Sequence, residues 1–140
     1  MGAWGTGIFD NDSAADWLYE YEDQGAPAVA SALSEVAETP ADDYVEVDMG
    51  SWALAAGEVV AAANGQPLEV GEELMATIAK HAAAVRSIDG LPASALRAMD
   101  RVMGANSELA ELWDEAGGED EAAFQAAAAD LRTRLKAIIG

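Results

Sequence analysis

The sequence predicts an all-α protein: a single globular bundle of six or seven short helices behind an irregular N-terminal segment rich in glycine and tryptophan. Three observations lead to this prediction. Apolar residues recur at helical spacing along the whole 140-residue chain. Alanine, the strongest helix former, supplies much of the 51% hydrophobic content. Glycine and proline divide the chain into short segments. At this length we expect one domain, residues 1–140.

Each expected helix lies between capping or breaking residues. The helices are expected from Asp12 or Ser13 to about Glu22, from Pro27 to Thr39-Pro40, from Trp52 (capped by Ser51) to about Ala63, from Gly71 to about Ser87, from Pro92 through Met103, from Asn106 or Ser107 to a hinge at Gly117-Gly118, and from Glu119 to Ile139. Val45 and Val47 alternate between the second and third helices, but this run is too short to indicate a strand.

Each helix has an apolar face that is expected to pack inward. The inward residues are Val29, Leu33 and Val36; Trp52, Ala56, Val59 and Ala63; Leu74, Ile78, His81, Val85 and Ile88; Leu96, Met99, Val102 and Met103; Leu109, Leu112 and Trp113; and Phe124, Ala128, Leu131, Leu135 and Ile138. The last helix has acids in its first turn and bases toward its end, which suits the helix dipole.

Charge is divided unequally along the chain. Residues 1–79 contain 16 Asp and Glu and no Lys or Arg, and all seven basic residues follow, so the formal charges are −16 and −3 for the two parts. Such a one-signed field repels nucleic acid and anionic membranes and attracts basic surfaces. We therefore expect neither nucleic-acid nor membrane binding. The bases of the last helix, Arg132, Arg134 and Lys136, are expected to pair with the acidic half across the fold.

The usual machinery of enzymes is missing from the residue types. The chain has no cysteine, a single histidine and no Gly-x-Ser-x-Gly motif. His81 lies on an apolar stripe, where a histidine can act as a general base but more often makes one hydrogen bond. We expect no cofactor and no catalytic residue, and we favour a non-enzymatic protein. Without cysteines, a signal sequence or a membrane-spanning run, a cytoplasmic location is expected.

Four carboxylates form the densest acidic group of the sequence: Asp42, Asp43, Glu46 and Asp48. Carboxylate clusters bind divalent cations weakly through oxygen ligands, and they also attract basic partners. The plainer interpretation is a solvated acidic loop. These residues are the candidates for a metal site or a partner-binding site.

The chain opens Met-Gly-Ala-Trp-Gly-Thr-Gly-Ile-Phe-Asp-Asn-Asp. Its glycines suggest a phosphate loop, but no strand precedes them and acids follow, so a structural turn is the preferred interpretation. The opening closely resembles a family of small bacterial proteins known only as a domain of unknown function, number 4259. The resemblance extends through Tyr44–Ala63 and Ala98–Ala116. It implies a helical protein and supplies no catalytic or binding residues.

The leading hypothesis is a protein–protein interaction module that acts through an acidic face. Its most concrete form is an immunity or antitoxin-like inhibitor that covers the basic active site of a toxin. A carboxylate-based metal-binding protein or hydrolase is the alternative. A third interpretation is acidity that serves solubility alone. The oligomeric state stays open.

Overall fold

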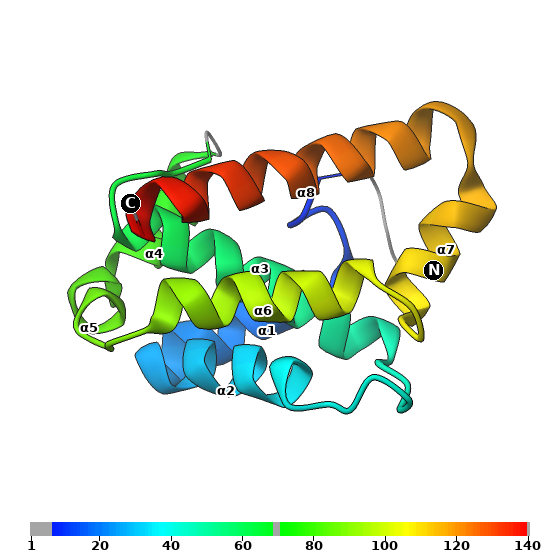
Figure 1. Cartoon of the computed structure of the whole chain (residues 1–140). Coiled ribbons are helices and arrows are strands. Elements are labelled where there is room, and N and C mark those ends of the chain that lie inside the picture. The colour runs from blue at the N-terminus through cyan, green and yellow to red at the C-terminus, as the bar shows by residue number, and fades with distance from the viewer. Residues whose placement is uncertain (1–6, 69–70, 140) are drawn as a thin grey trace.

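The computed structural model describes residues 7–68 and 71–139, and it confirms the all-α prediction (Figure 1). Within these ranges the chain forms eight helices and no strand. The helices are α1 (Asp12–Gln24), α2 (Ala26–Ala37), α3 (Val47–Ala63), α4 (Glu72–Ala79), α5 (Ala82–Arg86), α6 (Leu91–Met103), α7 (Glu108–Ala116) and α8 (Gly118–Ile139). The first six residues of the Gly/Trp-rich opening lie outside the described residues.

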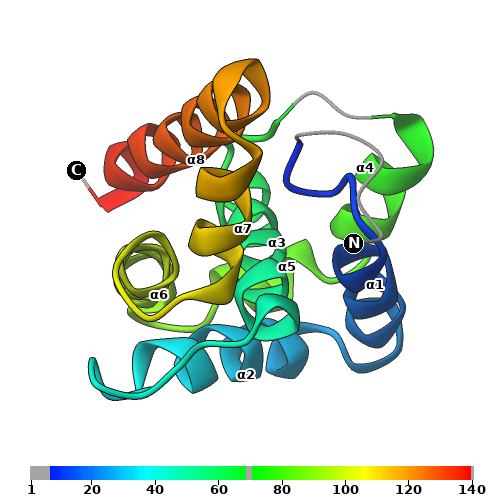
Figure 2. The ribbon, with the colours of Figure 1, turned by 90° about the vertical axis from the view of Figure 1, so that its right-hand side faces the viewer.

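Helix α3 lies at the centre of the bundle, and each of the other helices contacts it (Figure 2). Twelve of the 17 residues of α3 are buried, because a helix that is apolar on most of its sides is covered by its neighbours. Small residues allow these neighbours to approach closely. A Cβ added to Gly57 would lie 3.2 Å from Cδ2 of Leu131, and one added to Gly50 would lie 3.3 Å from Cβ of Leu109.

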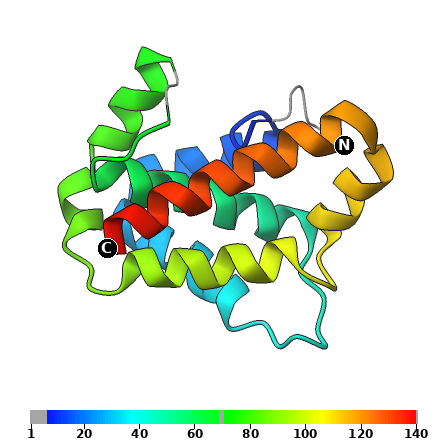
Figure 3. The same cartoon turned by 45° about the horizontal axis from the view of Figure 1, so that its top comes forward.

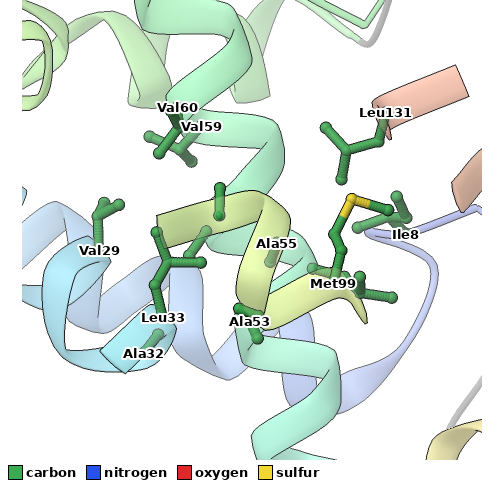
Figure 4. Packing of buried hydrophobic residues seen from close by; sticks show 14 of the residues in the cluster. Ile8, Val29, Ala32, Leu33, Ala53, Ala55, Val59, Val60, Met99 and Leu131 are labelled. Atoms are coloured by element: carbon green, nitrogen blue, oxygen red, sulfur yellow. The ribbon is translucent and has the colours of Figure 1, made fainter. Parts of the chain in front are cut away.

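The predicted inward faces of α2, α6 and α8 meet around this central helix (Figure 4). Most of their predicted side chains are buried, whereas Leu96, Met103 and Ile138 are only half-buried. The buried ones include Val29, Leu33, Val36, Met99, Val102, Phe124, Leu131 and Leu135. On α3, Ala56, Val59 and Ala63 are buried as expected, whereas Trp52 is only half-buried. Helical periodicity therefore identified most of the core correctly.

Two predicted helix starts are wrong. Asn11, and not Asp12 or Ser13, caps α1, because its Oδ1 accepts a 2.8 Å hydrogen bond from the Ala14 N–H. Helix α3 begins at Val47, so Ser51 lies inside the helix and is buried. The start of α3 is completed by a distant residue: Oε1 of Glu108 accepts a 2.9 Å hydrogen bond from the Val47 N–H.

The segment expected as one helix over residues 71–87 forms two helices, α4 and α5, which break at Lys80 and His81. Hydrogen bonds from α1 explain the break. The buried hydroxyl of Tyr21 donates to the Ile78 carbonyl at 2.6 Å. Nε2 of His81 lies 3.0 Å from the Glu22 carbonyl, to which it donates, and its ring meets the Tyr21 ring edge-on. His81 thus makes the single hydrogen bond that its position suggested.

One charged side chain is buried in the centre of the bundle. Glu58 of α3 is 2% exposed, and both of its oxygens lie 2.7 Å from guanidinium nitrogens of Arg134 on α8. Arg134 also contacts Asp130 and the Gln66 carbonyl. Burial raises the pKa of Glu58, and the hydrogen bonds from Arg134 oppose this rise. This pair confirms that a base of the last helix binds the acidic half.

We expect Arg134→Met to lower the free energy of unfolding by about 3–5 kcal/mol, because Glu58 is then a buried charge without a partner. The double variant Glu58→Met/Arg134→Met removes both charges and is expected to be neutral or more stable by about 1–4 kcal/mol. Urea unfolding followed by circular dichroism measures both values.

The pH dependence of the stability loss in Arg134→Met tests whether the unpaired Glu58 carboxylate causes that loss. Without Arg134, the pKa of Glu58 in the folded state rises further above its ordinary value of 4.5, so the folded protein binds a proton more tightly than the unfolded chain. Stability of Arg134→Met therefore falls as pH rises above 4.5, and its deficit shrinks on acidification. A deficit independent of pH, or a double variant as unstable as the single one, contradicts this explanation.

Candidate functional site

The predicted carboxylates lie in and directly after the connection between α2 and α3. We call residues 40–46 the acidic loop; Asp42, Asp43 and Glu46 belong to it, and Asp48 follows in the first turn of α3. All four side chains are exposed. The loop lies at one end of the bundle, next to the turn between α6 and α7 (Figure 3).

Backbone pairing fixes the middle of the acidic loop. Val45 forms an isolated parallel bridge with Ser107. The Val45 N–H donates to the Asn106 carbonyl, and the Glu108 N–H donates to the Val45 carbonyl, each at 2.9 Å. The Val45 side chain is fully buried. The alternation of Val45 and Val47, too short to indicate a strand, forms none: in the described residues Val45 makes an isolated bridge, and its partner is 62 positions away.

Arg101 holds the loop through carbonyl groups. Its guanidinium donates to the carbonyls of Thr39 (3.2 Å) and Pro40 (3.0 Å), to that of Asp43, and to that of Ala105 (2.8 Å). Within residues 7–68 and 71–139 it forms no ion pair with a carboxylate. The arginine therefore fixes the loop from behind and leaves the carboxylates to face solvent.

Two further contacts join the loop to α7. The amide of Asn106, whose φ of 57° is left-handed, donates to the Ala41 carbonyl at 2.9 Å. The hydroxyl of Tyr44 donates to Oε1 of Glu111 at 2.7 Å. This hydrogen bond, with desolvation and nearby glutamates, raises the pKa of Tyr44 from 10 to about 12, so the protonated, donating form of the phenol is favoured further.

Asp48 connects the site to α1. One of its carboxylate oxygens accepts a 2.6 Å hydrogen bond from the hydroxyl of Ser13. The acids of α1 thus continue the acidic surface of the loop. Asp12 and Asp16 are both exposed on this helix.

Few of the acids in this half meet a base. Residues 7–68 carry eleven exposed carboxylates, and in the described chain only Glu22 has an ion-pair partner, Lys80. The other ten are Asp12, Asp16, Glu20, Asp23, Glu35, Glu38, Asp42, Asp43, Glu46 and Asp48. Of the remaining bases, Arg132 pairs with Asp100 in its own half, and Arg86 donates to the Ala63 carbonyl.

The structure does not add support for a metal site at the four predicted carboxylates. Across the described ranges, no three His, Asp or Glu side chains lie where they could hold a metal ion. Sequence reasoning missed Arg101, Asn106 and Tyr44 as anchors of the loop. No local pattern marks Arg101 or Asn106 for this role. Tyr44 is different, because an aromatic residue in an acidic run indicates a contact with another part of the fold.

We expect Arg101→Ala to loosen the acidic loop, because the carbonyls it binds lose charge-assisted donors worth about 1.5–3 kcal/mol each. Exchange of the Val45 and Glu108 amide protons is expected to quicken by about tenfold or more. Arg97→Ala is the control, since Arg97 is exposed on the same helix and its side chain makes no hydrogen bond in the described structure. Equal protection of these amides in both variants contradicts the anchoring role.

Comparison with known proteins places the chain in a family without assigning it an activity. A family model described as "Domain of unknown function (DUF4259)" matches residues 2–127. A search of curated proteins and a search of solved structures each gave no match. In the described residues, no helix has the length and apolar character that crossing a membrane requires. The match covers most of the chain and confirms the expected family, so this chain belongs to the DUF4259 family.

Proposed function

We propose that the protein is a non-enzymatic binding module that docks a basic protein in the cytoplasm through the acidic loop and the adjoining acids of α1 and α2. The observation that carries the proposal is the set of ten exposed carboxylates in residues 7–68 that meet no base in the described structure. A surface of one sign attracts the opposite sign and accelerates encounter.

The anchoring of the loop supports this proposal. A flexible acidic segment loses conformational freedom when it binds, and this loss reduces affinity. The acidic loop is already held by Arg101, by the bridge at Val45 and by the Tyr44 hydroxyl. Its carboxylates therefore need little further ordering when a partner arrives.

The most specific form of the proposal is an immunity or antitoxin-like inhibitor. A toxin that acts on nucleic acid has a basic active site, and an acidic module that covers it competes with the nucleic acid. The alternative of a carboxylate metal site or hydrolase makes a different demand: millimolar Ca²⁺, Mg²⁺, Mn²⁺ or Zn²⁺ must raise the melting temperature.

We expect the quadruple variant Asp42→Asn/Asp43→Asn/Glu46→Gln/Asp48→Asn to lose a basic partner that the wild-type protein recovers from cells of its source. Binding by the wild type is expected to weaken steeply from low to moderate salt, since salt screens exposed charges beyond about 10 Å at 0.1 M. Affinity capture with mass spectrometry identifies the partner, and a purified pair gives the dissociation constant.

The matched control is Glu72→Gln/Asp89→Asn/Glu119→Gln/Asp120→Asn. It also removes four exposed carboxylates, from α4, α8 and the turn before α6, so the net charge of the two variants is equal. If both variants lose the partner to the same degree, only net charge matters and the acidic loop is not the docking site. A melting temperature raised by metal in the wild type alone favours the alternative.

A further inference from the structure

A small pocket lies between α1 and α2, over the central helix. Its volume is about 170 Å³. Its walls come from both helices, and α3 contributes Trp52. Ala28 and Ala32 of α2 are among the lining residues, and because their side chains are short they leave room for another group.

Aromatic surface is one part of this pocket. Trp17 of α1 is 2% exposed and stacks on Tyr21, with the ring centroids 5.7 Å apart. This stacking and burial fix the position of its ring. Trp52 is half-buried, so part of its ring remains available in the pocket. An indole ring attracts cations at its face and accepts the apolar stem of a long side chain.

The pocket also carries negative charge. Glu20 of α1 and Glu35 of α2 line the pocket from different helices, and both are exposed. Glu20 accepts a long hydrogen bond of 3.4 Å from Gln24. Neither glutamate has an ion-pair partner in the described chain. An aliphatic group with a cationic end fits this combination, whereas an anion is repelled.

Two residues that line the pocket lie close in the chain to the carboxylates of the proposed docking site. Trp52 lies one helical turn after Asp48 on α3, and Glu35 lies five residues before Pro40, where the loop begins. A basic partner that contacts Asp48 therefore lies one helical turn of α3 from Trp52, which lines the pocket.

We propose that this pocket takes a lysine or arginine side chain of the basic partner, with the stem against Trp52 and the cationic end between Glu20 and Glu35. This inference rests on the proposed function and adds the specific anchor that a broad acidic surface lacks. Buried anchor side chains in pockets dominate the affinity of many interfaces.

The test uses the full-length protein and the peptide acetyl-Ala-Lys-Ala-Lys-Ala-amide. The indole N–H signal of Trp52, assigned with Trp52→Phe, is followed by NMR. We expect it to shift on titration with this peptide and not with the peptide in which norleucine replaces both lysines. Because a hydrogen bond to a charged group is strong, Glu20→Gln/Glu35→Gln is expected to weaken binding by about tenfold.

The control variant Asp23→Asn/Glu38→Gln removes two exposed charges beside the same helices without altering the pocket lining. It is expected to weaken binding much less, and only at low salt. Equal losses in the two double variants overturn the pocket proposal. So does binding of free cadaverine that equals binding of the lysine peptide, since the pocket then takes a small diamine.

The two proposals fail separately. If the quadruple variant of the acidic loop loses the partner while Glu20→Gln/Glu35→Gln binds it like the wild type, the pocket proposal is overturned and the docking function stands. If the lysine peptide still shifts Trp52 but the quadruple variant binds the partner normally, the acidic loop is not the docking site.

Discussion

The structure depends on the burial of most of α3. Its buried faces must be filled, both of its ends must find hydrogen-bond partners, and its one buried charge, Glu58, must be neutralised. Residues from later in the chain meet the last two demands. Glu108 accepts from the first turn, Arg86 donates to the carbonyl of Ala63 at the end, and Arg134 binds Glu58 in the middle. Burial of the acidic half's central helix therefore requires the half that carries every base.

This requirement shapes the surface as well. Arg86, Arg101 and Arg134 bind carbonyl groups or a buried carboxylate, so they bring positive charge to the first half without covering its exposed acids. Only Lys80 pairs with an exposed carboxylate of residues 7–68 in the described chain. The cations that stabilise the fold and the carboxylates of residues 7–68 that face solvent thus lie on different elements of one bundle. A fold can remain stable in this way while its surface keeps one sign.

The helical spacing of apolar residues in the sequence predicted the core correctly where neighbouring residues alone decide the structure. Val29, Leu33 and Val36 repeat at helical spacing, and they are buried as that spacing predicts. Prediction failed where a distant residue decides. Ser51 has the chemistry of a cap, but Glu108 allows α3 to begin at Val47. The four site carboxylates were recognisable as a run of acids, whereas the anchor Arg101 reaches the loop only after folding brings α6 beside it.

Solubility alone would not require this placement of the acids. An acidic coat needs charge anywhere on the surface, and dispersed charges repel one another least. Here the acidic loop is fixed by hydrogen bonds from residues 101–111. Arg101 binds the loop's carbonyls while its carboxylates stay uncovered, although pairing with them would reduce self-repulsion. Concentrating like charge on an anchored loop has a cost that solubility does not require, and the proposed recognition of a basic surface gives a reason for it.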